Sequence, residues 1–146
     1  MTTVTTPRVP VPSGVESIRN VVLVGPSGAG KSRLFEHLVG SLAGSKAPRA
    51  GTDQNVGLRA ATVEREGVVV TLMDAPGNPD FVGEVRAGLR AADAALFVVS
   101  AADGVDATTR GLWHECSVVG MPRAVVITQL DASDAYFEAT LADCQA

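Results

Sequence analysis

Eight residues near the start of the chain have the types and the spacing of a phosphate-binding loop. Glycines in this pattern let the backbone turn tightly enough for several N–H groups to point at one anion. Lys31 would reach the β- and γ-phosphates of a nucleotide, and the Ser32 hydroxyl would contribute to the coordination of Mg²⁺. An ordinary glycine-rich turn is disfavoured, because an apolar strand precedes the loop and an amphipathic helix follows it. The eight residues fit G-x-x-x-x-G-K-[ST], and they are Gly25, Pro26, Ser27, Gly28, Ala29, Gly30, Lys31 and Ser32.

A second group follows the apolar run at residues 68–73. Asp74 ends that run, and a carboxylate in this place can hold Mg²⁺ through the water shell of the ion. Pro76 and Gly77 come next, and the Gly77 N–H would approach a terminal phosphate and sense whether that phosphate is present. By itself this tetrapeptide also fits an ordinary turn at the end of a strand. Its occurrence beside a phosphate loop favours the binding role.

A third group, Thr128-Gln129-Leu130-Asp131, follows the apolar run at residues 123–128. The Asp131 carboxylate can accept two parallel hydrogen bonds from the N1–H and the exocyclic amine of guanine. Adenine offers no such pair, so the wrong base would leave buried polar groups unpaired. The pattern T-x-x-D alone is a weak signal, and Asp131 could also simply begin the final helix. The position after the last strand favours a base-reading role.

The periodicity along the chain predicts the elements that position these groups. Strands are expected at residues 21–24, 56–64, 68–73, 94–100 and 123–128. Helices are expected at residues 31–42 and 80–92, and two more follow, the last one capped by Ser133. Their expected inner faces are Leu34, Leu38 and Leu42; Phe81, Val82, Val85 and Leu89; Leu112, Cys116 and Val119, with Trp113 beside them; and Phe137, Leu141 and Cys144.

Alternation of strands and helices predicts an α/β fold, a P-loop three-layer sandwich with a mainly parallel sheet. Ligands of such sheets lie at the carboxyl ends of the strands. The three groups of polar residues each follow a strand. They are therefore expected to open on one edge of the sheet and to form a single site.

The composition bounds the class of protein. The chain has 146 residues, 46% of them hydrophobic and 19% charged, with a net charge of −4. One globular domain of residues 18–146, after a disordered lead-in at residues 1–17, is expected. The overall charge does not favour binding to nucleic acid or anionic lipid. No apolar stretch is long enough to span a membrane, and the expected compartment is the cytoplasm. Cys116 and Cys144 lack metal-ligand spacing and are expected to be small core residues.

In their order and content, the three groups resemble the successive motifs of a GTPase domain. The stretches 80–86 and 89–99 resemble translational GTPases, above all elongation factor G. The stretches 104–106 and 120–127 are similar to an actinobacterial elongation-factor-G-like branch. The likeness extends from about Ile18 to Asp131. It implies a small-GTPase-like G domain that binds GTP or GDP with Mg²⁺, and it makes the ribosome a possible partner.

Two departures from the family concern hydrolysis. Only 43 positions separate Lys31 from Asp74, whereas the family has a long switch loop there, with a threonine on Mg²⁺ and the γ-phosphate. Thr52 lacks the flanking residues of the family, and Thr62 falls within an expected strand, so the switch threonine is expected to be absent. The family usually has a histidine after D-x-P-G, where it positions the attacking water. This chain has Asn78 in that position.

Two further departures concern the base and the end of the domain. The base-reading motif of the family carries asparagine and lysine, where this chain has Thr128 and Gln129. The sequence stops at Ala146, before the last strand of the family's G domain and its Ser-Ala loop. A truncated domain that lacks this last strand is therefore expected.

The sequence predicts guanine-nucleotide binding with weak or absent GTP hydrolysis. Lys31 would stabilise the transferred phosphate, and Asn78 occupies the position of the water-orienting histidine. Two alternatives stay open: a non-catalytic nucleotide-binding or regulatory module, and a fragment of a longer translation factor. A small-molecule or nucleoside kinase shares the phosphate loop but does not need the other two motifs in this order.

Overall fold

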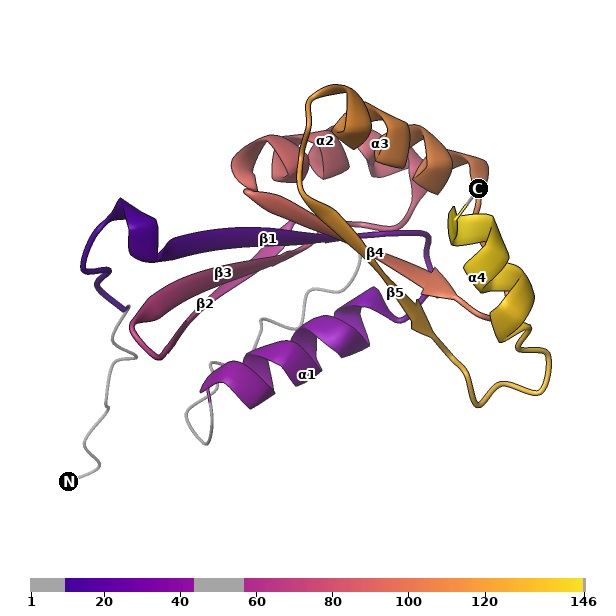
Figure 1. Ribbon diagram of the computed structural model, residues 1–146, viewed down its shortest axis with the longest axis horizontal. Helices are drawn as coiled ribbons and strands as arrows, with labels where there is room; N and C mark the ends of the chain where they lie inside the picture. The colour runs from indigo at the N-terminus through magenta and orange to yellow at the C-terminus, as the bar shows by residue number, and fades with distance from the viewer. Residues whose placement is uncertain (1–9, 44–56, 146) are drawn as a thin grey trace.

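The computed structural model describes residues 10–43 and 57–145. Within them, five strands form one sheet in the order β2-β3-β1-β4-β5 (Figure 1). β1 (Ile18–Val24), β3 (Val68–Asp74), β4 (Ala94–Ser100) and β5 (Arg123–Thr128) run parallel, and β2 (Arg59–Arg65) is antiparallel to β3. The predicted α/β fold with a mainly parallel sheet is therefore confirmed.

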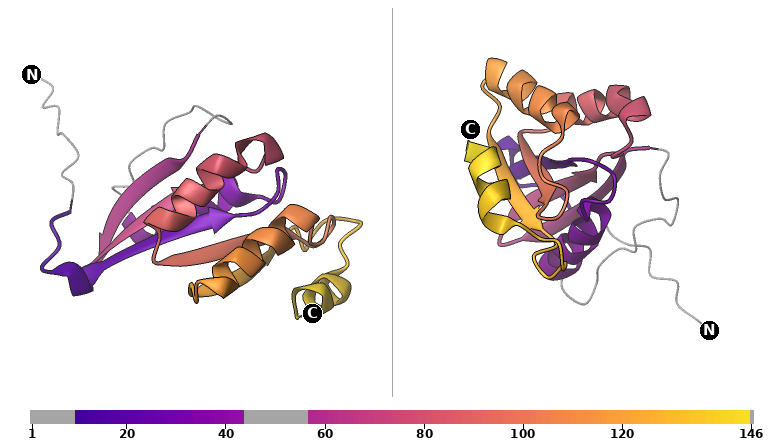
Figure 2. Two further views of the ribbon diagram at one scale, coloured as in Figure 1. Left: turned by 90° about the horizontal axis from the view of Figure 1, so that it is seen from above. Right: turned by 90° about the vertical axis from the view of Figure 1, so that its right-hand side faces the viewer.

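Helices cover both faces of this sheet. α1 (Lys31–Ala43) lies on one face, while α2 (Val82–Ala91) and α3 (Ala107–Val118) lie on the other (Figures 1 and 2). α4 (Phe137–Gln145) lies beside β5, the edge strand of the described sheet. Two short 3-10 helices, η1 (Val15–Ser17) and η3 (Pro79–Phe81), precede β1 and α2. The layers are those of the predicted three-layer sandwich.

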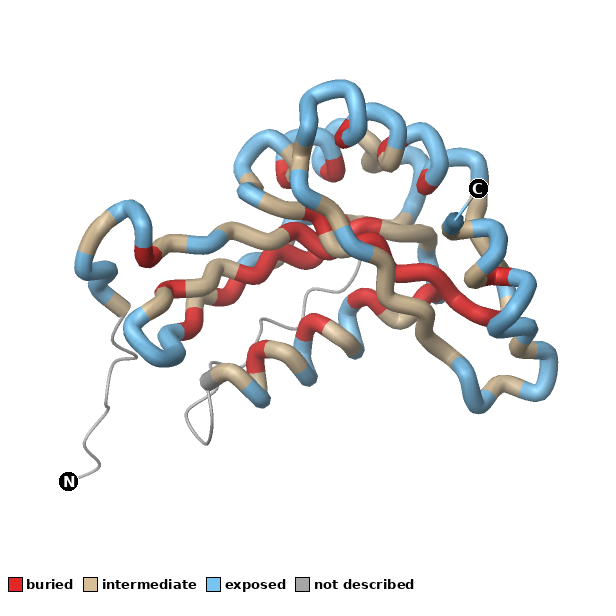
Figure 3. The backbone as a smooth tube through the Cα atoms, in the orientation of Figure 1, coloured by how far each residue is buried: buried red, intermediate tan, exposed pale blue. Residues whose placement is uncertain are grey.

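The sheet has one hydrophobic core on each face, because successive side chains of a strand point to opposite sides. In β1, Val22 and Val24 belong to the core under α2 and α3, and Leu23 between them belongs to the core over α1. All three side chains are buried, and the buried residues of the sheet gather towards its middle (Figure 3). Parallel strands covered on both faces have continuous apolar sequences for this reason.

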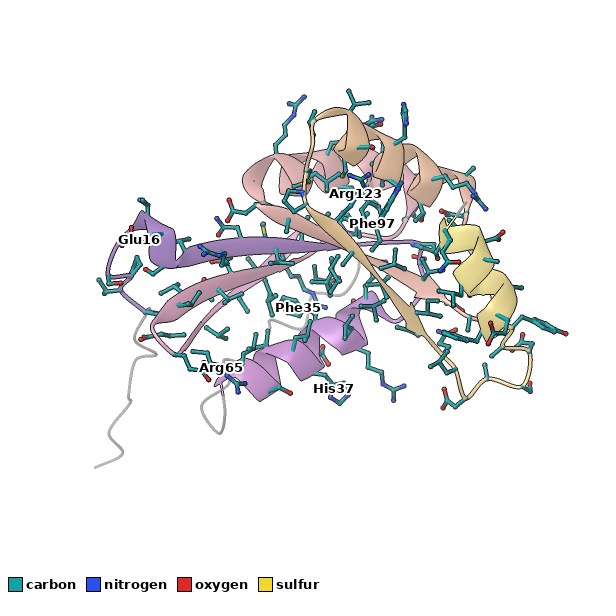
Figure 4. The ribbon with its side chains drawn as sticks, in the orientation of Figure 1. Glu16, Phe35, His37, Arg65, Phe97 and Arg123 are labelled. Carbon is teal, nitrogen blue, oxygen red and sulfur yellow. The ribbon has the colours of Figure 1, made fainter. Side chains whose placement is uncertain are left out.

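The buried face of α1 differs from the predicted leucine stripe. Phe35 and Val39 are the fully buried residues, and Leu34, Leu38 and Leu42 pack beside them as partly buried neighbours. Phe35 points towards the sheet, whereas His37 points away from it (Figure 4). The helix is rotated towards Phe35 because the larger aromatic ring removes more apolar surface from water than a leucine does.

The predicted inner face of α3 is correct for Leu112 and Cys116 and wrong for Val119. Leu112 and Cys116 are buried, but Val119 is 75% exposed because α3 ends at Val118. Beside them, the Trp113 ring packs edge-on against Phe97, with a centroid distance of 5.0 Å. The Arg123 guanidinium lies over the Trp113 ring. Arg123 and Phe97 lie close together in Figure 4.

The last helix also differs from the prediction. Its buried residue is Thr140, whereas Phe137 is 42% exposed and Leu141 and Cys144 are half-buried. The buried Thr140 hydroxyl is satisfied, since it donates to the Ala101 carbonyl oxygen at 3.4 Å. Burial raises the pKa of the Cys116 thiol and of the Cys144 thiol, so both are poor nucleophiles near neutral pH.

Element boundaries agree with the prediction at β4 and β5 and differ elsewhere. β1 begins earlier than expected, at Ile18, and β2 begins later, at Arg59. The helix expected from residue 80 is divided between η3 and α2. η1 lies within the expected lead-in of residues 1–17, and Ser17 is buried there. Residues 1–9 and the expected loop at 45–55, with Thr52, lie outside the described residues.

Candidate functional site

The glycine-rich loop between β1 and α1 has a backbone that other residues would strain. Gly25, Gly28 and Gly30 have φ of 151°, 87° and 84°, which side chains rarely allow. At Gly25 a Cβ atom would also collide with the carbonyl oxygen of Val98 on β4. The loop therefore lies directly against the end of the sheet. It lines a cavity of about 490 Å³.

Lys31 projects from the start of α1 into this cavity and is buried, with only 6% of its surface exposed. Its Nζ donates to the Pro26 carbonyl oxygen at 2.8 Å, so the loop holds the side chain in place. Burial lowers the pKa of the Lys31 ammonium below its ordinary value, against the opposing effect of the Asp74 carboxylate. A buried ammonium with one hydrogen bond has free donors for an anion.

The turn after β3 closes over the glycine-rich loop. The backbone N–H of Ser27 donates to the Gly77 carbonyl oxygen at 3.0 Å. A Cβ atom on Gly77 would lie 2.5 Å from the Ser27 nitrogen and would also collide with Lys31 Nζ. Gly77 is therefore needed for the close approach of the two loops. The structure brings these two predicted groups together at one cavity.

Ser32 and Asp74 meet on the same side of the cavity. The Ser32 hydroxyl donates to Asp74 Oδ2 at 2.8 Å. Asp74 is 4% exposed, and its Oδ1 is buried without a hydrogen-bond partner among the described residues. Such an oxygen is costly to bury unless a cation or water contacts it. The Ser32 hydroxyl and the Asp74 carboxylate, with its unpartnered Oδ1, are hard oxygen donors of the kind that Mg²⁺ takes from a protein. The residues present therefore fit a Mg²⁺ ion.

Arg59 also belongs to this site, and the sequence analysis missed it. It opens β2 directly opposite Asp74, and its guanidinium donates to Asp74 Oδ2 from Nε at 3.2 Å and from Nη2 at 2.5 Å. A signal was available in the sequence, because Gly67 lies between two strand-like runs and so indicates a hairpin turn. In the structure, Glu66 and Gly67 have φ values of 54° and 79°, which are those of a two-residue hairpin. That turn pairs Arg65 with Val68, and the same register then pairs Arg59 with Asp74.

The loop after β5 is tied to the phosphate loop from the other side. The Thr128 hydroxyl donates to the Ala29 carbonyl oxygen at 2.7 Å. The Gln129 amide donates to the Gly28 carbonyl oxygen at 2.6 Å, and its own oxygen accepts from the Ser100 hydroxyl at 2.7 Å. Asp131 lies two residues beyond Gln129 and is exposed. The third predicted group therefore adjoins the first, with Asp131 free for a ligand.

Asn78 lies at the rim of the cavity. It is exposed, and its side-chain oxygen accepts a hydrogen bond from the Asp80 N–H at 3.0 Å, which caps η3. Among residues 10–43 and 57–145, no threonine lines the cavity. Thr62 lies within β2, as expected, and its hydroxyl is 3.2 Å from that of Thr71.

Comparison with known proteins identifies the family. Residues 16–146 match the family described as the elongation factor Tu GTP binding domain. The chain belongs to this family. It is a GTP-binding domain of the translational-GTPase type, as the resemblance implied.

The curated relatives include two elongation factor G-like proteins of Mycobacterium tuberculosis, from strains CDC 1551 / Oshkosh and H37Rv. Each is 47% identical to this chain over 151 residues, which covers 93% of the chain and 21% of the relative. This member of the family therefore spans about a fifth of their length. Because the 151 aligned positions exceed its 146 residues, the relatives have residues in this region with no counterpart here.

Solved structures show the same fold. A crystal structure of a Thermus thermophilus protein superposes with a TM-score of 0.75 at 37% identity, and it covers 88% of this chain and 22% of that one. Translation elongation factor SelB of Methanococcus maripaludis, solved with the GTP analogue GppNHp, gives a TM-score of 0.69 at 24% identity, over 87% of this chain and 25% of that one. In the described part of this GTP-binding domain, no helix is long and apolar enough to cross a membrane.

Proposed function

We propose that the cavity between the glycine-rich loop and the Asp74 turn binds the phosphates of GTP or GDP. The observation that carries this proposal is the buried Lys31 ammonium, which lies beside Gly77 and has donors to spare. The backbone of residues 25–32 would hold the α- and β-phosphates, and the start of α1 adds a positive dipole. Gly77 would contact the γ-phosphate through its N–H.

The proposed metal ligands are Ser32 and Asp74. In the described chain, no group of three or more His, Cys, Asp or Glu residues is arranged to hold a metal ion. Mg²⁺ ordinarily takes one or two carboxylates from the protein and the remaining ligands from water and phosphate, so a complete protein cage is not required. When bound, Mg²⁺ would neutralise charge on the phosphate oxygens.

The proposed reader of guanine is Asp131, with Thr128 and Gln129 as the residues that fix its loop. Both side chains donate to carbonyl oxygens of the phosphate loop. These bonds hold the Asp131 loop beside the phosphate loop, where one nucleotide can contact both. The exposed Asp131 carboxylate can then accept from the N1–H and amine of the base.

We infer that this domain hydrolyses GTP weakly or not at all. Asn78 already uses its side-chain oxygen to cap η3, and an amide cannot take a proton as an imidazole does. The described lining of the cavity holds no threonine for the γ-phosphate. The relatives have residues in the aligned region that this chain lacks, which agrees with a shortened segment between Lys31 and Asp74. These observations equally favour a second candidate, a nucleotide-binding module that acts by docking without turnover.

The wider setting is proposed from the family alone. The relatives are named as elongation factor G-like proteins, so a role in translation, in the cytoplasm and with the ribosome as partner, is the setting we propose. The proposed domain covers residues 18–146, which lie within the family match over residues 16–146.

Titration of the purified chain tests the central proposal. A fluorescent GDP analogue should bind saturably, and unlabelled GDP and GTP should displace it. ADP and ATP should compete at least about a hundredfold less well, since they lack the two donors that Asp131 would accept. Equal competition by adenine and guanine nucleotides would overturn the assignment of Asp131, and the absence of any binding would overturn the nucleotide site itself.

A further inference from the structure

The guanidinium of Arg59 is an additional positive charge inside the proposed nucleotide site. Asp74 Oδ2 accepts from Arg59 Nε, from Arg59 Nη2 and from the Ser32 hydroxyl. The two charged side chains are 17% and 5% exposed, so solvent screens them little. The same three residues line the phosphate cavity with Lys31 and Gly77. Arg59 thus neutralises the carboxylate that is proposed to hold Mg²⁺.

The surroundings of Arg59 hold it in this position. The guanidinium carbon lies 5.3 Å from the centre of the Phe35 ring, and Phe35 points from α1 towards the sheet (Figure 4). Glu36 is within 3.8 Å of the guanidinium on its other side. The antiparallel register of β2 with β3 places the Arg59 backbone opposite Asp74. An aromatic face, two carboxylates and a fixed register leave the side chain little freedom.

This arrangement affects any divalent cation at Ser32 and Asp74. Arginine stays protonated at all ordinary pH values, so its charge cannot be removed to admit another cation. A cation that shares Asp74 with the guanidinium is repelled by it, and the repulsion is strong where water is excluded. The Ser32 hydroxyl also has its proton directed at Asp74 Oδ2. Mg²⁺ therefore gains less from Asp74 here than from an unpaired carboxylate.

We propose that Arg59 is a built-in cation of the nucleotide site, which competes with Mg²⁺ at Asp74 and makes nucleotide binding largely independent of Mg²⁺. The inference rests on the proposed function, because it concerns the same cavity. Arg59 supplies near the phosphates a positive charge that would otherwise come from the ion. The coupling between Mg²⁺ and the nucleotide is reciprocal, so it can be measured through the affinity of either.

The test compares GDP affinity in millimolar Mg²⁺ with GDP affinity in excess EDTA, by equilibrium fluorescence titration. For the wild-type chain we expect the two dissociation constants to differ by less than about fivefold, the lower end of ordinary coupling between two ligands. For Arg59→Gln we expect the ratio to increase to between about 10-fold and 150-fold. The increase should come from weaker binding in EDTA and stronger binding in Mg²⁺.

Arg65→Gln is the matched control. Arg65 lies in the same strand, is 56% exposed and pairs only with the neighbouring Glu66 among the described residues. Arg65→Gln changes the net charge by the same amount as Arg59→Gln. It should leave the ratio of the two GDP dissociation constants at the wild-type value. An equal rise in both variants would show a general charge effect and overturn the proposal.

The wild-type ratio is itself a test, so the proposal can still be refuted if Arg59→Gln fails to fold. A wild-type ratio above about fivefold, in the ordinary range of ligand coupling, would overturn it. So would equal ratios in the wild type and Arg59→Gln. Either result leaves the nucleotide site intact. If neither protein binds GDP with or without Mg²⁺, the proposed function itself has failed.

Discussion

The Thr128 hydroxyl donates to the carbonyl oxygen of Ala29, 99 residues away in the sequence, at 2.7 Å. The same hydroxyl is 3.1 Å from the Val99 carbonyl oxygen on β4. One side chain thus joins the phosphate loop, the sheet and the proposed base-reading loop. The relative position of phosphate and base contacts depends on this junction, which a sequence motif alone cannot reveal.

Thr128→Val should weaken both stability and nucleotide binding. Valine has the same shape but no donor, so the carbonyl oxygen of the buried Ala29 loses its partner. We expect a loss of about 1–2 kcal/mol in the free energy of unfolding, measured with urea. GDP affinity should fall as well, since the two loops are no longer joined. Thr108→Val, at an exposed position on α3, should change neither quantity.

Gly77→Ala should damage the site while the fold remains. The added methyl group would lie 2.5 Å from the Ser27 nitrogen and 2.8 Å from the Pro26 carbonyl carbon, so the two loops must separate. We expect a loss of GTP affinity of about 1–3 kcal/mol, the range of overpacking. Gly83→Ala meets no atom within 4 Å in α2 and should keep the wild-type affinity. Unchanged affinity in Gly77→Ala would show that nucleotide binds elsewhere.

Lys31 should make stability depend on pH in the alkaline range. Burial lowers its pKa in the native state, so the native lysine releases its proton before the unfolded one does. Between the lowered native pKa and the unfolded value of about 10.4, the unfolded state binds more protons. Stability therefore rises with pH in that window. Relative to Lys31→Met, wild-type stability should rise with pH there. Lys31→Met should also lose about 1.5–3 kcal/mol of GDP affinity.

The control for Lys31 is Arg33→Met on the same turn of α1. Arg33 is exposed, and a guanidinium does not titrate in this range. Urea unfolding at several pH values should therefore give a constant difference between the wild type and Arg33→Met. If the difference between the wild type and Lys31→Met is constant as well, the lowered pKa is not a feature of the native protein.

How well the sequence predicts an element or a contact depends on how far apart in the chain the interacting residues lie. The glycine-rich loop, β4 and β5 are local patterns, and they lie where they were expected. The packing face of α1 could not be predicted, because its orientation depends on how the Phe35 ring fits a core built from residues far along the chain. Val119 satisfies the helical spacing but lies beyond the end of α3.

The candidate site shows the same limit. Lys31, Ser32, Asp74 and Gly77 could be predicted as candidate site residues because each belongs to a short motif. Arg59 belongs to none, and its role depends on the antiparallel register that places it opposite Asp74. The hydrogen bonds from Thr128 and Gln129 to the phosphate loop likewise join segments about a hundred residues apart.

Asp131→Asn should reduce the preference for guanine and spare the phosphate contacts. The amide cannot accept two parallel hydrogen bonds, so GDP should lose about 1.5–3 kcal/mol of affinity while ADP is unaffected. Competition titration measures the ratio of the two constants. Asp134→Asn removes another exposed carboxylate close by and should leave the ratio unchanged. If the ratio survives in Asp131→Asn, another residue reads the base.

The last prediction concerns turnover. Asn78 caps η3 with its side-chain oxygen and cannot pass a proton, and a positioned acid–base group is typically worth about 10²–10⁴ in rate. A histidine at this position would therefore restore one contribution to the rate of hydrolysis, that of a positioned acid–base group. Asn78→His should recover only part of the activity, because the described cavity lining still offers no threonine to the γ-phosphate.

The control is Asp80→His, which places an imidazole at another exposed position two residues away and should not raise the rate of hydrolysis. Single-turnover hydrolysis with excess protein is the measurement. Wild-type turnover at or above about 10⁻² s⁻¹, the rate of a GTPase with its stabilising arginine in place, would contradict the prediction.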